Sequence, residues 1–257
     1  MLACDALNIS RCTYYYQPVR VDDSEIIDAV SQLAEKHVRY GFKKIYTRLR
    51  LMGYEWNHKR VYRIYCGLKL NLRRKAKKRL PNRHPEPLCV PAKKNDCWSM
   101  DFMSDSLYSG KGFRTFNVID DYNRESLAIE IDSSIPSERV IRVLDRIAAY
   151  RGYPKKIRQD NGPEIISHKL ELWAEQHGIK LDFIEKGKPT QNAYIERFNR
   201  TYRNEVLDAY LFNTISDVRE ITDNWINEYN YERPHESLND VPPKDYEKLM
   251  LEGSFNK

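Results

Sequence analysis

Hydrophobic side chains in the first third of the chain follow a helical pattern. Between residues 24 and 70 they recur every three or four positions in three stretches, and each stretch predicts a helix with one buried face. Ser24 is expected to cap the first helix and Asn57 the third, because short polar side chains accept hydrogen bonds from free amides at helix starts. The second helix is expected over Phe42–Met52, with Gly53 as its stop.

The third helical stretch has a basic exposed face, which carries Lys59, Arg60 and Arg63. Two short helices joined by a glycine-containing turn, the second of them basic, are typical of a helix-turn-helix that binds DNA. We therefore predict an all-helical, helix-turn-helix DNA-binding domain over 24–70, with its recognition helix at 58–66. A generic three-helix bundle with a solvated basic face is the alternative that the pattern leaves open.

Two segments flank these helices. Residues 1–23 are interpreted as an N-terminal arm with one short helix capped by Ser10. Residues 71–92 are interpreted as a linker, because four prolines interrupt secondary structure and like charges keep the chain extended. Eight Lys or Arg and no Asp or Glu occur from 69 to 83. Beside a DNA-reading motif such a run favours phosphate contacts, here expected from Arg73, Arg74, Lys75, Lys77 and Lys78.

From residue 93 onward the hydrophobic pattern alternates as in strands, and helical stretches separate the later strands. The predicted strands are Trp98–Ser104, Phe113–Asp120, Ser126–Ile131, Lys156–Gln159 and Lys180–Ile184. Helices are expected from Pro136 or Ser137, from about His168 and from about Asn192. The order β-β-β-α-β-α-β-α matches an α/β, ribonuclease-H-like domain with a mixed five-stranded sheet over 93–207. A C-terminal extension at 208–257 is expected to pack on it through a helix at 217–231, capped by Ser216.

Composition narrows the class of protein. With 41% hydrophobic and 12% aromatic residues the chain has enough apolar side chains for a folded core. Its five cysteines and six histidines show no zinc-finger spacing, and an odd number of cysteines is typical of reduced thiols. The start shows no signal-peptide pattern, and no apolar run approaches transmembrane length. These observations predict a soluble intracellular protein.

Three carboxylates stand where folding does not require them. Asp101 interrupts a Trp/Met/Phe run, Asp160 ends a short strand, and Glu196 lies among apolar helix residues. Because hard divalent cations prefer oxygen ligands, the three are predicted to converge on a metal site. Other acids lie near these motifs. Asp120 and Asp121 are expected to make local hydrogen bonds at a strand end, and Asp105 and Glu164 are not assigned to the metal.

The chain contains four motifs in the order Trp98–Phe102, Val118–Arg124, Gln159–Glu164 and Asn192–Asn199. Together they resemble the integrase core of insertion-sequence transposases of the IS3 family, which are related to retroviral integrases. The resemblance extends through Arg39–Gly41, Asn57–Tyr62 and Glu232–His235, so it covers nearly the whole chain. The family has a D,D(35)E arrangement of acids. Here residues 161–195, which number 35, separate the second Asp from the Glu.

The resemblance implies a DNA transposase of the second-reading-frame type. Asp101, Asp160 and Glu196 would be its catalytic residues and would hold two Mg²⁺ ions, or Mn²⁺, roughly 3.5–4 Å apart. Asp101 would bridge both ions. Water would free a 3′-hydroxyl at the end of the element, and that hydroxyl would attack a second phosphodiester. Arg200 and Arg203 lie on the same face of the helix as Glu196, and Arg203 occupies a position that is basic in the family, so both are expected to contact DNA.

The resemblance also implies partners and a location. Terminal inverted repeats and target DNA would be substrates, and an upstream-frame protein would supply a further helix-turn-helix and a coiled coil. A homo-oligomer on DNA, in the bacterial cytoplasm and at the nucleoid, is expected. A non-catalytic DNA-binding regulator derived from such an element is the alternative. A nuclease for RNA–DNA hybrids is disfavoured by the helix-turn-helix and the basic segment.

Overall fold

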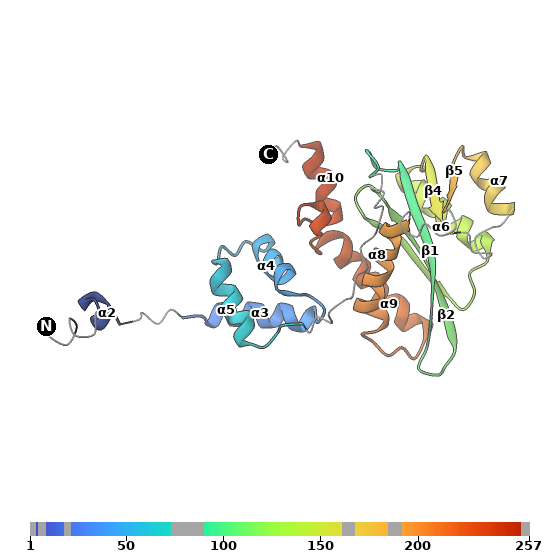
Figure 1. The fold of residues 1–257 in the computed structure, drawn as a ribbon. Helices are drawn as coiled ribbons and strands as arrows, with labels where there is room; N and C mark the ends of the chain where they lie inside the picture. Colours follow the sequence, from blue (N-terminus) through green and yellow to red (C-terminus); the bar gives the residue numbers. More distant parts are fainter. Residues whose placement is uncertain are drawn as a thin grey trace, which may run out of the picture.

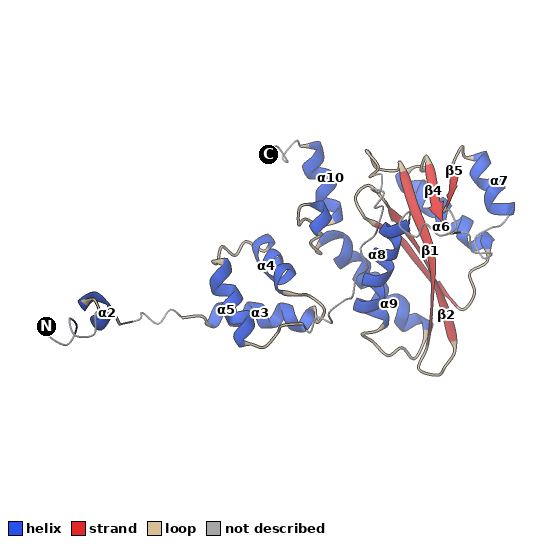
Figure 2. Ribbon diagram, viewed as in Figure 1, coloured by secondary structure: helices blue, strands red, loops and turns tan. Residues whose placement is uncertain are grey.

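The computed structural model describes residues 4, 9–17, 22–72, 90–160, 168–184 and 192–252. In these ranges the ribbon forms an all-helical unit and a larger unit built on a sheet (Figure 1; Figure 2). The N-terminal helix α2 (Arg11–Tyr15) lies apart from both units in this view. The side chain of Ser10 caps it by accepting a hydrogen bond from the amide of Thr13, as predicted.

The helical unit consists of three short helices around one apolar core: α3 (Ser24–Lys36), α4 (Phe42–Leu51) and α5 (His58–Gly67). The predicted cap at Asn57 is confirmed, since its side chain accepts a hydrogen bond from the amide of Lys59. Gly53 follows α4 with φ of +93°, a conformation that favours glycine. The predicted cap at Ser24 is wrong: Asp23 is the N-cap residue and Ser24 is the first residue of the helix.

The sheet has five strands in the order β3-β2-β1-β4-β5, which confirms the predicted mixed sheet. Its strands are β1 (Cys97–Ser106), β2 (Gly112–Asp120), β3 (Ser126–Asp132), β4 (Lys156–Gln159) and β5 (Lys180–Phe183). The first three form the predicted antiparallel meander, and β4 and β5 add to it in parallel. The short strand β4 therefore lies beside the first half of the long strand β1 (Figure 1).

Helices cover both faces of the sheet. Trp98 and Met100 of β1 belong to the apolar core formed with α6 (Ser137–Arg151) and α7 (His168–Gln176). Met103 belongs to the opposite core, formed with α8 (Ala193–Tyr202) and α9 (Ile215–Tyr231). Because successive side chains of a strand point to opposite faces, Asp101 shares the face of Met103 and lies under α8.

The C-terminal part differs from prediction in two places. Thr214, not Ser216, caps α9, and Thr214 and Asp217 hydrogen-bond reciprocally as a capping box. A further helix, α10 (Pro243–Leu251), was not predicted, because Pro242 and Pro243 resemble a break. Proline is well suited to the first helical turn, where its missing N–H costs nothing. Among the described helices, none is long and apolar enough to cross a membrane.

Candidate active site

Asp101 occupies the centre of the sheet and is fixed by two hydrogen bonds. Its Oδ1 accepts from the backbone amide of Phe102 at 2.8 Å, and its Oδ2 accepts from Nδ2 of Asn199 at 2.8 Å. The second bond joins β1 to α8, the helix that carries Glu196. The carboxylate therefore has one fixed orientation below that helix.

A second amide extends this contact to the neighbouring strand. Asn117 faces Asp101 in the antiparallel register of β1 and β2, and its Nδ2 donates to Oδ1 of Asn199 at 2.7 Å. Both asparagines are buried. The sequence includes Asn199 in the motif Asn192–Asn199 but did not identify it as a partner of Asp101, and Asn117 was not predicted at all. The available signal was an amide between the apolar residues Phe116 and Val118, on the strand predicted next to the one that carries Asp101.

The other two predicted acids lie around Asp101. The parallel register pairs Ser99 of β1 with Arg158 of β4, and Asp160 follows directly after the end of β4 at Gln159. Glu196 is exposed in the first turn of α8, one turn before Asn199. Both acids are near enough to Asp101 for their charges to act on it.

The pKa of Asp101 reflects its burial and the acids near it. Burial is the main effect that raises its pKa, and the negative charges of Asp160 and Glu196 add to it, so the pKa rises to about 6. The hydrogen bonds that Phe102 and Asn199 donate to Asp101 lower its pKa and so offset part of this rise. A cation held between the carboxylates would relieve this repulsion, and carboxylate oxygens are the donors that hard divalent ions prefer. Within the described residues, however, no three His, Cys, Asp or Glu side chains already form a metal-ligand cluster.

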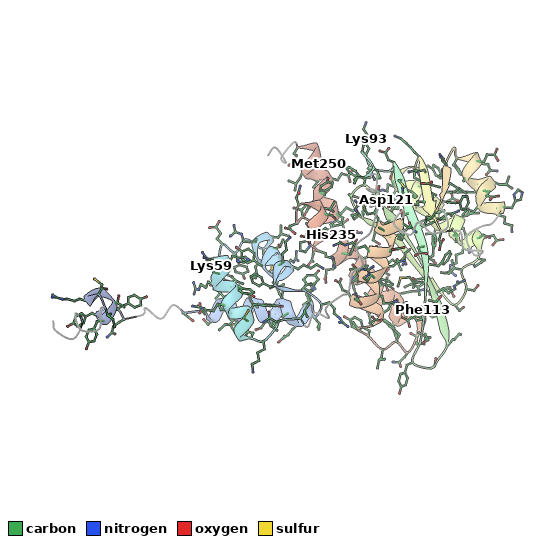
Figure 3. The ribbon with its side chains drawn as sticks, viewed as in Figure 1. Lys59, Lys93, Phe113, Asp121, His235 and Met250 are labelled. Carbon is green, nitrogen blue, oxygen red and sulfur yellow. The ribbon has the colours of Figure 1, made fainter. Side chains whose placement is uncertain are left out.

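Two nearby acids have a different role. Asp120 accepts hydrogen bonds from Nη2 of Arg151 at 2.7 Å and from the amide of Tyr122 at 2.9 Å. Asp121 pairs with Nη1 of Arg158 at 3.0 Å and is labelled in Figure 3. The local hydrogen bonding predicted at Asp120 is confirmed. Both aspartates are fully buried, and their partner arginines make them structural.

The two arginines predicted on the face of Glu196 differ in their surroundings. Arg203 begins a π-helical turn, Arg203–Leu207, that continues α8. Its guanidinium donates to Oδ2 of Asp105 at 3.2 Å and to the carbonyl of Ser104 at 2.9 Å, so it is held against β1 near the acids. Arg200 is exposed in the last turn of α8.

The predicted DNA-binding residues of α5 are also distinguished by their contacts. Asp23 holds both arginines: Arg60 Nε lies 2.7 Å from its Oδ1 and Arg63 Nη2 lies 2.8 Å from its Oδ2. Lys59 is exposed on the side of the helical unit away from the sheet (Figure 3). Five predicted contacts, and the acid Glu164, fall outside the described residues; the five are Arg73, Arg74, Lys75, Lys77 and Lys78.

A five-stranded mixed sheet of this order, with helices on both faces, matches the ribonuclease-H-like fold of integrase cores. The integrase core domain matches residues 91–189 and, in a second family model, 177–243; an HTH-like domain matches 21–78. The chain belongs to the integrase-core family of IS3-type insertion-sequence transposases, which are metal-dependent DNA transposases.

Relatives from insertion elements match along nearly the whole chain. Two are uncharacterised proteins, each 37% identical over 245 residues and 95% of this chain. One is the 39.2-kDa protein of IS476 from Xanthomonas euvesicatoria, covered to 71%. The other is the 31.7-kDa protein of IS407 from Burkholderia multivorans, covered to 88%. A solved HTLV-2 integrase catalytic core in complex with magnesium is 16% identical, with a TM-score of 0.47, over 59% of this chain and 95% of that one.

Proposed function

We propose that Asp101, Asp160 and Glu196 are the catalytic residues and metal ligands of a transposase that cleaves at the ends of its insertion sequence. The freed 3′-hydroxyl would then be transferred to target DNA. The supporting observation is the position of Asp101 at the sheet centre, where Asp160 and Glu196 lie near enough to raise its pKa. Three carboxylates that repel one another are a poor arrangement for stability and a suitable one for divalent cations.

The proposed cofactor is a pair of Mg²⁺ ions, for which Mn²⁺ can substitute. When bound, two such ions activate the attacking oxygen and neutralise the leaving oxygen of an in-line displacement. The protein's part is to hold the carboxylates. Asn199 orients Oδ2 of Asp101, and Asn117 holds Asn199 in turn, so that α8 presents Glu196 at a fixed height above the sheet.

The DNA contacts form three groups. Lys59, Arg60 and Arg63 would bind the terminal inverted repeats through the helical unit, and the basic residues at 73–78 would contact phosphate without regard to sequence. Arg200 and Arg203 would contact the cleaved end, because both follow Glu196 on α8. For Arg203 a DNA phosphate would compete with Asp105, its present partner.

The proposed partners are further protein chains. The chain would act with an upstream-frame protein that supplies an additional helix-turn-helix and a coiled coil, and as a homo-oligomer on DNA. Two element ends must be brought to one target in strand transfer, and an oligomer would do so.

The test is incubation of the chain with labelled element ends and Mg²⁺, with and without the upstream-frame protein. We expect cleavage and joining that require the metal, and we expect Asp160→Asn to abolish both while leaving DNA affinity unchanged. DNA binding without cleavage under every condition would contradict the proposal and would favour a regulator. Cleavage of RNA–DNA hybrids without strand joining would favour a nuclease.

A further inference from the structure

A second charged site lies on the other side of α8, where the helical unit meets the sheet unit. It is a pocket of about 190 Å³ lined by side chains from α4, the turn between β2 and β3, α8 and the segment after α9. On α8 the lining residues are Tyr194, Arg197, Phe198 and Thr201, which follow one another at helical spacing. Phe198 is two positions from Glu196, about 200° around the helix. The pocket is therefore separate from the carboxylates.

The pocket has an excess of positive charge. Five basic side chains line it, of which Lys43 is neutralised by Glu236 at 2.8 Å and Arg233 by Glu205 at 2.7 Å. Asp240, a second acidic lining residue, lies 3.8 Å from Lys43. Lys44 lies 4.0 Å from Glu205, which Arg233 already engages, and the remaining two basic side chains are Arg124 and Arg197. Burial, followed by the charge of Arg233, lowers the pKa of Lys44 to about 8. The charges of Arg233 and Arg197 add to the effect of burial, whereas Glu205 opposes it.

Two polar atoms in this pocket are buried without a hydrogen-bond partner among the described residues. One is Nη1 of Arg124, whose guanidinium carbon lies 3.4 Å from the ring centre of Tyr194. The other is Nε2 of His235, which lies between the two units (Figure 3). Nη1 of Arg124 can only donate, and an unpaired buried donor is costly, so its position in a basic pocket indicates a missing acceptor. Burial lowers the pKa of His235 well below its ordinary value, so the ring is neutral and its Nε2 does not require an acceptor.

The size of the pocket limits the acceptor. At roughly 30 Å³ each, about six water molecules would fill it. Pockets for drug-sized ligands begin at roughly 300 Å³. A single phosphate group therefore fits, and a nucleotide does not. The planar forks of Arg124 and Arg197 suit phosphate oxygens, which they can bind through two parallel hydrogen bonds.

We propose that this pocket binds one backbone phosphate of DNA, held by Arg124, Arg197 and Lys44, and so joins the helical unit and the catalytic unit to the same duplex. The inference rests on the proposed function only in taking DNA as the substrate. The two units already contact each other next to the pocket: Arg48 pairs with Glu232, and His37 Nδ1 lies 2.9 Å from Glu228. A phosphate bound between α4 and α8 would add a contact that forms only on DNA.

The main variant is Arg197→Gln, because Arg197 is exposed on α8 and its replacement leaves the core intact. Arg142→Gln is the matched control: it removes the same charge from an exposed position on α6, on the other face of the sheet. Arg124→Lys is the second variant, which keeps the charge and removes the fork. All three are made in Asp160→Asn protein, so that binding is measured without catalysis.

Fluorescence anisotropy with terminal-repeat and random duplexes at several salt concentrations supplies the readout. We expect Arg197→Gln to weaken binding to both duplexes about tenfold. We expect it to reduce the slope of log affinity against log salt by about 0.9, the value for one lost phosphate contact. Arg124→Lys should also weaken binding to both duplexes. The Arg142→Gln control should have the affinity and the salt slope of its parent. Equal affinity and equal slope for the Arg197 variant and its parent would overturn the proposal.

Neutral methylphosphonate linkages, placed singly along the duplex, identify the phosphate. A methylphosphonate at one position should weaken DNA binding by the parent protein. The same linkage should not weaken binding by the Arg197 variant any further, since both changes remove the same contact. The second source of phosphate is the free ion. Inorganic phosphate is compared with chloride at equal ionic strength. If phosphate raises the melting temperature of the parent protein but not of the Arg197 variant, and if no methylphosphonate position weakens DNA binding, the assignment to DNA is wrong. Failure of cleavage by the wild-type chain would overturn the proposed function and leave these binding results standing.

Discussion

Asp101 and Glu125 are both carboxylates withdrawn from water in the same sheet unit, and their pKa values move in opposite directions. Burial would raise the pKa of Glu125, but Arg151 and Lys244 lower it below its usual range. Burial raises the pKa of Asp101, and its acidic neighbours raise it further, to about 6. The difference is the counter-charge, because the fold supplies arginines to one group of acids and amides to the other. An acid paired with arginine stabilises the fold, whereas an acid supported only by amides is available to a ligand.

The largest expected effect comes from an acid without a counter-charge. Glu196→Gln keeps the shape of an exposed side chain in the first turn of α8 and removes one of the proposed metal ligands. We expect strand joining to fall at least about 1,000-fold, since metal ions supply several kcal/mol of transition-state stabilisation. The free energy of unfolding should change by less than about 0.5 kcal/mol. Joining assays and urea unfolding on the same preparation check both values, and an active variant would refute the assignment.

Removal of a counter-charge should have the opposite consequence. Arg151 donates to Asp120 at 2.7 Å and to Glu125 at 2.5 Å, and all three side chains are buried. Arg151→Ala leaves Asp120 buried without its charged partner and leaves Glu125 with Lys244 alone, which is expected to cost about 3–5 kcal/mol of unfolding free energy. Arg146→Ala, which removes an exposed arginine from Glu130, should cost less than about 1 kcal/mol. Similar losses of unfolding free energy for the two variants would contradict the view that Arg151 is the counter-charge on which the buried acids depend.

Asp101 should reduce the stability of the metal-free protein at neutral pH. Its pKa is about 6 in the folded chain, against an ordinary aspartate value of 3.8, so the folded form binds a proton more tightly than the unfolded form. The free energy of unfolding therefore falls as pH rises from about 4 to 6. Above that range the loss due to Asp101 stays constant. We expect Asp101→Asn to stabilise the protein by about 1–3 kcal/mol at pH 7.5, with little difference below pH 4. Unfolding in the presence of a chelator tests this, and a variant less stable at pH 7.5 would disprove it.

The smallest of these effects concerns the amide that orients Asp101. Asn199→Ala removes the donor to Oδ2 and leaves Nδ2 of Asn117 without its acceptor. We expect the Mg²⁺ concentration for half-maximal joining to rise about 10- to 100-fold, as for other residues that orient metal ligands. Joining at saturating Mg²⁺ should recover much more than it does for Glu196→Gln. Loss that no Mg²⁺ concentration reverses would show that Asn199 does more than position the ligand.

Several errors of prediction were local and had local causes. Ser216 and Thr214 are both good capping residues, and Thr214 is the cap because Asp217 stands three positions after it. Pro243 resembled a helix breaker and begins α10 instead. Arg63 is exposed as predicted and Arg60 is half-buried, and what the sequence did not indicate is that both pair with Asp23, 37 and 40 positions away along the chain. Such a pairing leaves no trace in hydrophobic periodicity.

The sequence by itself determined the three helices, the five strands and the three unusually placed acids, because hydrophobic periodicity and turn residues act over a few positions. Alternation along β1 even set the face on which Asp101 lies. Tertiary structure alone decided the partners. Asn199 is 98 positions from Asp101 and 82 from Asn117, and Arg124 meets Tyr194 from another element. Hydrogen bonds and charges act through space, so contacts between distant residues exist only once the chain has folded.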